Sequence, residues 1–209
     1  MTPEQPQKRT RPQPGSNEQR TLAGASIRAL REDEGGNDRQ FRLSFSSEEP
    51  YQRWYGLEIL DHGNGAVDLT RINEIGVVLF NHNRDYVVGK ILKAWVEDNR
   101  GYADIEFDTD EDADIVCQKV KSGTLKGVSV GYRIEVFEEV VAGKQSVDGR
   151  FTGPCSIARK WWPFEISIVS VPADGTVGVG RQAELNDRTI PLDVFEAQLQ
   201  INQNGGITA

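Results

Sequence analysis

The chain has few of the residues on which metal and disulfide chemistry depend. Its 209 residues include only two cysteines, Cys117 and Cys155, which form no CxxC pair. Scattered cysteines of this kind predict plain thiols and argue against a structural zinc site. With only two histidines, His62 and His82, a mechanism that needs an imidazole base has two candidates. We expect no metal ion and no other cofactor.

Long apolar runs and clusters of basic residues are missing as well. No apolar segment approaches the roughly 20 residues that cross a bilayer, and the N-terminus, MTPEQPQKRTRPQPG, lacks the apolar segment of a secretory signal. We therefore expect a cytoplasmic protein without a membrane partner. The net charge of -8 argues against nucleic-acid binding. Neither GxxxxGK[ST] nor GxGxxG occurs in the sequence, so no nucleotide site is predicted.

Composition divides the chain into three parts. Residues 1–38 are polar and rich in Pro, Gln, Arg and Glu, which predicts a disordered N-terminal tail. Residues 39–181 carry patterned apolar segments and predict one folded domain. Residues 182–209 predict a C-terminal tail, in which residues 191–200 can form a short helix.

Alternating apolar and polar residues predict that the domain is mainly β. Strands are expected at 41–45, 55–60, 76–80, 87–96, 103–107, 128–136 and 164–168. A helix is expected from about residue 110, capped by Asp108 or Thr109. Residues 138–160 predict a long mobile loop, and residues 172–180 a closing turn. The fold class is mainly β with flanking helices, arranged as a barrel or a strongly curved sheet.

His82 follows the buried strand 76–80, at a place where a scaffold can fix the ring and a loop can expose it. By composition alone, a surface histidine in a turn is the simpler interpretation. His62, in DHGNG, is a weaker candidate, because a glycine-flanked turn positions a ring poorly.

Ser129 lies on the polar side of strand 128–136, whose other side is apolar. Gly127 and Gly131 flank it and leave room for the close approach of a substrate chain. Arg133, on the same side, is a tentative group for stabilising an oxyanion. An ordinary solvent-facing serine beside glycines fits the same pattern.

Several carboxylates are able to orient an imidazole. Glu165 alternates out of an apolar strand, and Asp85 and Asp104 are rivals for the same task. A solvated strand residue is the plain alternative for each of them. Cys155, served by His82, is a weaker nucleophile candidate because it falls in the predicted loop.

Three segments together resemble the prohead proteases of tailed bacteriophages. They are VLFNHNRDYVVGKI (residues 78–91), LKGVSVGYRI (residues 125–134) and FEISIVSVPAD (residues 164–174). Their order and spacing are similar to those of the family, and the resemblance extends over residues 39–181. Residues 39–72 also resemble a subgroup that is made in one chain with the major capsid protein. This sequence carries no capsid domain, so a truncated, processed or stand-alone form is expected.

The resemblance implies that His82 is the base, Ser129 the nucleophile and Glu165 the third member of a catalytic group. It also implies a herpesvirus assemblin-like fold, an antiparallel β-barrel ringed by helices. The implied function is a serine endopeptidase that cleaves major capsid protein, scaffold and its own tails during prohead maturation. The implied location is inside the assembling prohead in the host cytoplasm, in a homo-oligomer.

Two other hypotheses stay open. One is a catalytically inactive capsid assembly or scaffold component with the same fold, which the acidic balance and polar tails fit equally well. The other is a cysteine hydrolase that uses Cys155.

Overall fold

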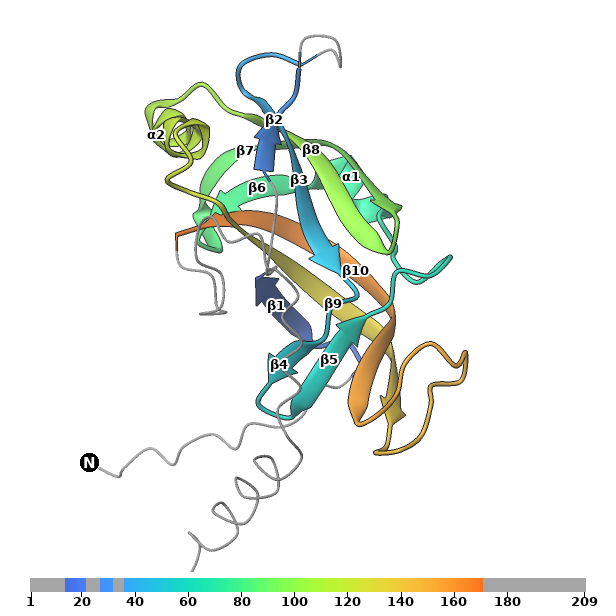
Figure 1. The fold of residues 1–209 in the computed structure, drawn as a ribbon. Helices are drawn as coiled ribbons and strands as arrows, with labels where there is room; N and C mark the ends of the chain where they lie inside the picture. The colour runs from blue at the N-terminus through green and yellow to red at the C-terminus, as the bar shows by residue number, and fades with distance from the viewer. Residues whose placement is uncertain (1–13, 22–26, 32–35, 171–209) are drawn as a thin grey trace, which may run out of the picture. The chain divides into compact units, whose positions relative to one another are not determined.

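Ten strands form one strongly curled sheet in the computed structural model, which describes residues 14–21, 27–31 and 36–170 (Figure 1). These residues belong to the compact unit Met1–Val177. The strands lie in the order β1-β9-β10-β6-β7-β8-β3-β2, and β5 pairs with both β4 and β10. The prediction of a mainly β domain is therefore confirmed.

The strands are β1 (Asn17–Thr21), β2 (Ile27–Ala29), β3 (Gln40–Ser47), β4 (Tyr51–Arg53), β5 (Gly56–Leu60), β6 (Val77–Phe80), β7 (Asn83–Glu97), β8 (Arg100–Phe107), β9 (Gly127–Val140) and β10 (Cys155–Val169). The helices are α1 (Thr70–Ile75) and α2 (Glu111–Lys121). Neither helix in the described part of the chain is long and apolar enough to cross a bilayer.

The two long strands β9 and β10 form the centre of the sheet. They pair antiparallel from Cys155 opposite Val140 to Val169 opposite Gly127. Figure 1 shows both strands, in yellow and orange, running through the whole domain. Their length follows from alternation, because every second residue along 128–134 and 166–168 is a fully buried apolar side chain.

One edge of β10 carries two successive strands that run parallel to it. β5 pairs with residues 156–158 of β10, and β6 pairs with residues 166–168. Between them, Val67 makes a single parallel bridge to Trp161. The sheet is thus mixed, and the expectation of a wholly antiparallel barrel is wrong in this respect. The chain from β5 through Val67 and α1 to β6 advances along this one edge without reversing its direction.

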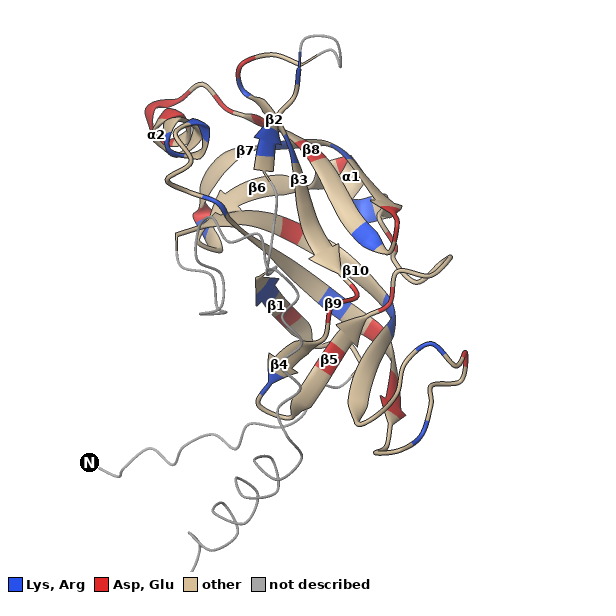
Figure 2. Ribbon diagram, viewed as in Figure 1, with Lys and Arg blue, Asp and Glu red and all other residues tan. Residues whose placement is uncertain are grey.

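Helix α2 packs by one apolar face, as its sequence predicts. Its buried residues are Ala113, Val116, Cys117 and Val120. The cap is Asp110, whose carboxylate accepts a hydrogen bond from the Ala113 amide at 3.0 Å, and not the expected Asp108 or Thr109. Acidic residues occupy the first turn and lysines the last, which suits the helix dipole (Figure 2).

Two parts of the structure differ from the sequence-based expectation. Strands β1 and β2 lie within the predicted tail 1–38, because their backbones pair with β9 and β3, although β1 is wholly polar and β2 has only three residues. The predicted loop 138–160 is shorter, since β9 continues to Val140 and β10 begins at Cys155. The predicted turn 172–180 and helix 191–200 lie outside the described residues.

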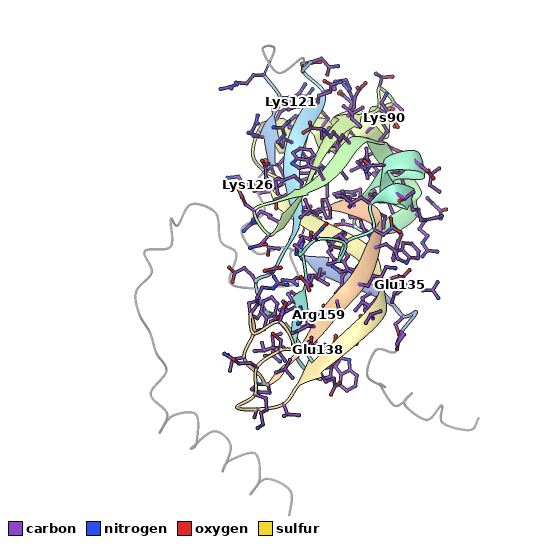
Figure 3. All side chains as sticks on the ribbon, turned by 90° about the vertical axis from the view of Figure 1, so that its right-hand side faces the viewer. Lys90, Lys121, Lys126, Glu135, Glu138 and Arg159 are labelled. Atoms are coloured by element: carbon purple, nitrogen blue, oxygen red, sulfur yellow. The ribbon has the colours of Figure 1, made fainter. Side chains whose placement is uncertain are left out.

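Ion pairs hold the remaining loop, 141–154, against the sheet. Arg159 of β10 binds Glu138 of β9 at 2.6 Å, and Figure 3 shows the two side chains close together. Arg159 also binds Asp148 in the loop and Asp61 after β5, at 2.8 and 2.7 Å. Arg150 of the loop makes ion pairs with Asp61 and with Glu48. Charged residues that look like a solvated loop in the sequence therefore fix its position.

His62 is a buried structural residue, contrary to its expected place in a loose turn. Its Nδ1 donates to the Leu60 carbonyl at 2.9 Å, so its Nε2 accepts from the Ser46 hydroxyl at 2.8 Å. Its ring also packs edge-on against Trp161. Burial, together with nearby Arg20 and Arg100, lowers the pKa of His62 to about 4.

We predict that His62 makes the fold sensitive to mild acid. The unfolded chain takes up the proton near pH 6.5 while the folded chain resists it until about pH 4. The contribution of neutral His62 to the free energy of unfolding is thus complete above pH 6.5. It decreases by about 3 kcal/mol as the pH falls from 6.5 towards 4. Chemical denaturation of wild type and His62→Gln between pH 7 and 4 measures this loss. Equal pH slopes for the two proteins would contradict the prediction.

Candidate active site

His82 is presented by a tight hairpin turn between β6 and β7. Phe80 and Asn83 pair across it, and the two turn residues Asn81 and His82 have φ of 52° and 60°. A two-residue turn with two left-handed residues has the twist that suits a hairpin, and Asn and His tolerate this region better than most residues. The ring is therefore attached to a short, defined turn.

Hydrogen bonds clamp this turn onto the end of β10. The Asn81 amide donates to the Ile168 carbonyl at 2.9 Å, and its side-chain oxygen accepts from the Ser170 amide at 2.9 Å. The His82 amide donates to the Ser167 hydroxyl at 3.2 Å. The backbone below the ring is thus fixed to the same strand that carries Glu165.

A bulge in β10 determines where Glu165 points. The pairing register with β9 shifts between Pro163 and Glu165, so that Pro163 lies opposite Tyr132 and Glu165 opposite Gly131. Proline inside a sheet is found at such irregularities because it lacks a ladder donor. The bulge turns Glu165 onto the same side of the sheet as Ser129, next to the β6–β7 turn.

The structure brings Ser129, His82 and Glu165 into one chain of hydrogen bonds. His82 Nε2 lies 2.8 Å from Ser129 Oγ, and His82 Nδ1 lies 2.6 Å from Glu165 Oε1. An ionised carboxylate only accepts, so Nδ1 carries the proton towards Glu165. In the neutral ring, Nε2 is then the acceptor that faces the serine hydroxyl. This arrangement can draw a proton from the serine and hold it on the imidazole.

Ser167 is a further member that the sequence analysis did not single out. Its hydroxyl donates to Glu165 Oε2 at 2.6 Å and accepts from the His82 amide, and the residue is fully buried. It lies directly opposite Ser129 in the β9–β10 register. Its alternation with Glu165 on the polar side of the strand is the sequence signal that points to it.

The three tentative substrate or oxyanion residues have other surroundings. A Cβ on Gly131 would lie 2.4 Å from Glu165 Oε1, so this glycine makes room for the carboxylate. Gly127 begins β9 opposite Val169. Arg133 lies four residues beyond Ser129, roughly 13 Å along the strand, and its guanidinium is beside Gly15. None of the three is among the residues that line the pocket at Ser129.

The rival candidates lie elsewhere in the described part of the chain. Asp85 is exposed on β7, and Asp104 pairs with Arg42 at 2.8 Å. Cys155 begins β10, roughly 30 Å along the strand from Glu165, and burial raises the pKa of its thiol. A cysteine nucleophile served by His82 does not fit this geometry. No group of three or more His, Cys, Asp or Glu side chains within the described ranges is arranged to hold a metal ion.

Ser129 lies at one wall of a pocket of about 390 Å³. Only 1% of its surface is exposed, because β1 pairs with β9 and places Thr21 opposite it. The Ser129 hydroxyl also lies 2.9 Å from the Arg20 carbonyl oxygen. The pocket lining consists of Gln19, Arg20, Thr21, Tyr51, Arg53, Asn81, His82, Ser129, Val169 and Ser170.

A buried polar cluster supports the wall formed by Arg53. Glu58 is fully buried and accepts hydrogen bonds from Tyr132, from Tyr55 at 2.6 Å and from Arg53 at 3.2 Å. Burial and the Glu58 carboxylate raise the pKa of both tyrosines, which keeps them as neutral donors. Although burial opposes it, Tyr132 and Glu58 raise the pKa of Arg53. Arg53 therefore keeps its positive charge at the pocket.

We predict that Gly131→Ala damages the site through Glu165. The added methyl collides with Oε1 and with the Phe164 ring, so the carboxylate has to leave His82 Nδ1. A displacement of about 1 Å in such a group costs on the order of 10²-fold in rate. The measurement is the rate at which a fluorophosphonate probe labels Ser129.

The matched control is a double-mutant cycle with Glu165→Ala. If the methyl acts through the carboxylate, Gly131→Ala slows labelling in the wild-type background and has little further effect when Glu165 is absent. Equal slowing in both backgrounds would mean that the glycine matters for another reason.

Comparisons with known proteins relate the chain to bacteriophage proteins. Residues 63–187 match the family described as caudovirus prohead serine protease. The chain is also 35% identical over 164 residues to a protein named major capsid protein from Halomonas phage phiHAP-1, a match that covers 77% of this chain and 26% of that protein. No solved structure gave a match. The chain belongs to the caudovirus prohead serine protease family.

Proposed function

We propose that the protein is a serine endopeptidase in which Ser129 is the nucleophile, His82 the general base and Glu165 the orienting carboxylate. The observation that carries this proposal is the continuous pair of hydrogen bonds from Ser129 Oγ to His82 and from His82 to Glu165. A residue of β9, a residue of the β6–β7 turn and a residue of β10 meet there in the arrangement of a nucleophile, a base and an orienting carboxylate.

The proposed reaction begins when Ser129 Oγ attacks a peptide carbonyl carbon and its proton moves to His82 Nε2. Glu165 stabilises the imidazolium that forms. His82 then gives the proton to the leaving amine as the peptide bond breaks, leaving an acyl ester on Ser129. A water molecule, activated by His82, releases the acid and restores the hydroxyl. No metal or organic cofactor takes part.

Ser167 has the role of a positioning residue in this proposal. It holds the second oxygen of Glu165 and the backbone of His82 at once. Arg133 has no assigned role, because its guanidinium is beside Gly15. Arg53, which lines the pocket, is the partner that we propose for a developing oxyanion.

The substrates that we propose are the major capsid protein and scaffold of the phage, together with the chain's own tails. The likeness to a capsid protein supports this choice, although the chain spans only 26% of that relative. The proposed place of action is inside the prohead as it assembles in the host, with the protease in a homo-oligomer. The curled sheet is compatible with a herpesvirus assemblin-like fold, which we retain as a proposal.

We predict that Ser129→Ala abolishes probe labelling and lowers capsid protein cleavage by several orders of magnitude without unfolding the protein. Ser122→Ala is the matched control, because Ser122 is exposed at the end of α2. Electrophoresis of capsid and scaffold proteins incubated with each variant gives the rates. Cleavage that persists in Ser129→Ala would remove the nucleophile assignment. A wild-type protein that is neither labelled nor active would favour the inactive assembly component.

We also predict that Ser167→Ala lowers kcat about tenfold and leaves KM nearly unchanged, since Ser167 touches Glu165 and His82 but does not line the pocket. Steady-state kinetics on a capsid-derived peptide measure both constants. A rise in KM at constant kcat would instead place Ser167 in substrate binding.

A further inference from the structure

Strand β1 is the feature at the site that the proposed reaction leaves unexplained. It is the end strand of the sheet, and it pairs with β9 from Asn17 opposite Arg133 to Thr21 opposite Ser129. Without it, the backbone of β9 from Ser129 to Arg133 would be an open sheet edge. Open edges bind extended peptides by strand addition.

The contact between β1 and Ser129 is incompatible with attack on a substrate. The Arg20 carbonyl oxygen accepts a hydrogen bond from Ser129 Oγ at 2.9 Å, so it takes up space beside the oxygen that a substrate carbonyl carbon has to approach to roughly 3–3.5 Å. Ser129 also has one proton for two acceptors, the Arg20 carbonyl and His82 Nε2. While β1 is bound, a substrate carbonyl has no room beside the nucleophile.

The side chain of Arg20 fills a defined place next to the nucleophile. It is almost wholly buried, donates to the Glu49 carbonyl and lies over the Tyr51 ring at 5.2 Å. The place therefore accepts a long side chain that lies on an aromatic face and ends in a hydrogen-bond donor.

Several features make β1 easier to remove than the core strands. Its residues, NEQRT, include no apolar side chain that could anchor it. Two buried nitrogens of Arg20, Nε and Nη1, have no hydrogen-bond partner among the described residues, and such groups oppose docking. The Glu18 carboxylate lies 3.9 Å from the Arg53 guanidinium, which is long for an ion pair.

We propose that β1 occupies the place of the substrate: an extended peptide segment pairs antiparallel with residues 129–133 of β9, its long side chain lies on Tyr51, and β1 leaves to admit it. This inference rests on the proposed role of Ser129 as nucleophile. The partner that binds the β9 edge is an extended, unfolded segment of a protein substrate. Access to the site is regulated by the exchange of β1 for that segment.

The first experiment measures binding at the edge directly. A fluorescein-labelled peptide with the sequence of residues 14–21 is titrated into the full chain and into the full-chain variant Gln19→Pro/Arg20→Pro. Successive amides of a strand point to opposite sides, so one of the two prolines removes a bond to β9. We expect a rise in anisotropy with the variant and at least tenfold weaker binding to the wild type.

The matched control carries two prolines in the strand at the opposite end of the sheet, Arg28→Pro/Ala29→Pro in β2. It is expected to bind the peptide as weakly as the wild type. A peptide in which Arg20 is replaced by alanine is expected to bind the β1 variant several-fold more weakly. Absence of peptide binding to a folded β1 variant would overturn the inference, and so would equal binding to the control.

The second experiment follows Ser129 itself. Fluorophosphonate labelling is expected to be at least tenfold faster in Gln19→Pro/Arg20→Pro than in wild type, and slower in Arg20→Met, which removes the unpartnered nitrogens and keeps a long side chain. If the two variants change the labelling rate in opposite directions, the effect comes from release or retention of β1, because misfolding would lower the rate in both. Equal rates in all three proteins would overturn the inference and leave the proposed function standing. If no form is labelled, the proposed function fails, and peptide binding alone decides whether the β9 edge accepts a strand.

Discussion

The register between β9 and β10 is the constraint on which the site depends. It places Ser129 opposite Ser167 and Gly131 opposite Glu165, while β6, paired to the other edge of β10, delivers His82. A slip of one residue would turn the polar side chains of β10 to the other side of the sheet. Buried valines and isoleucines on the opposite side of both strands oppose such a slip, so the hydrophobic core fixes the geometry of the polar group.

The buried polar groups that surround the site form hydrogen bonds with one another. The hydroxyl of Ser167 and both oxygens of Glu165 have partners, and the fully buried Glu58 has three donors around it. Such networks hold their members rigidly because a lost bond leaves a buried polar group unsatisfied. Arg20 is the contrast at the site, since two of its guanidinium nitrogens have no partner among the described residues. The well-paired groups around Ser129 belong to the scaffold, and Arg20 belongs to the strand that covers Ser129.

Alternation in the sequence predicted the strands that bury a continuous apolar row, and it put Ser129 and Glu165 on the correct side of theirs. It missed β1 and β2, because backbone pairing at an edge needs no apolar pattern. It also misplaced His62, since the Leu60 carbonyl and Ser46 that hold the ring are brought together only by folding. The role of Gly131 depended on the bulge at Pro163, and the surroundings of Arg133 depended on the segment before β1, which its polar sequence does not reveal.

The central place of β10 has a consequence for the synthesis of the protein. β10 separates the strand of Ser129 from the hairpin of His82, and it supplies the carboxylate that binds the His82 ring on the side away from Ser129. It is also the last of the described strands to leave the ribosome. A nascent chain in which Ser129 and His82 have already been synthesised still lacks β10, the strand that aligns them. The three groups can therefore come together only after β10 has been synthesised and has left the ribosome.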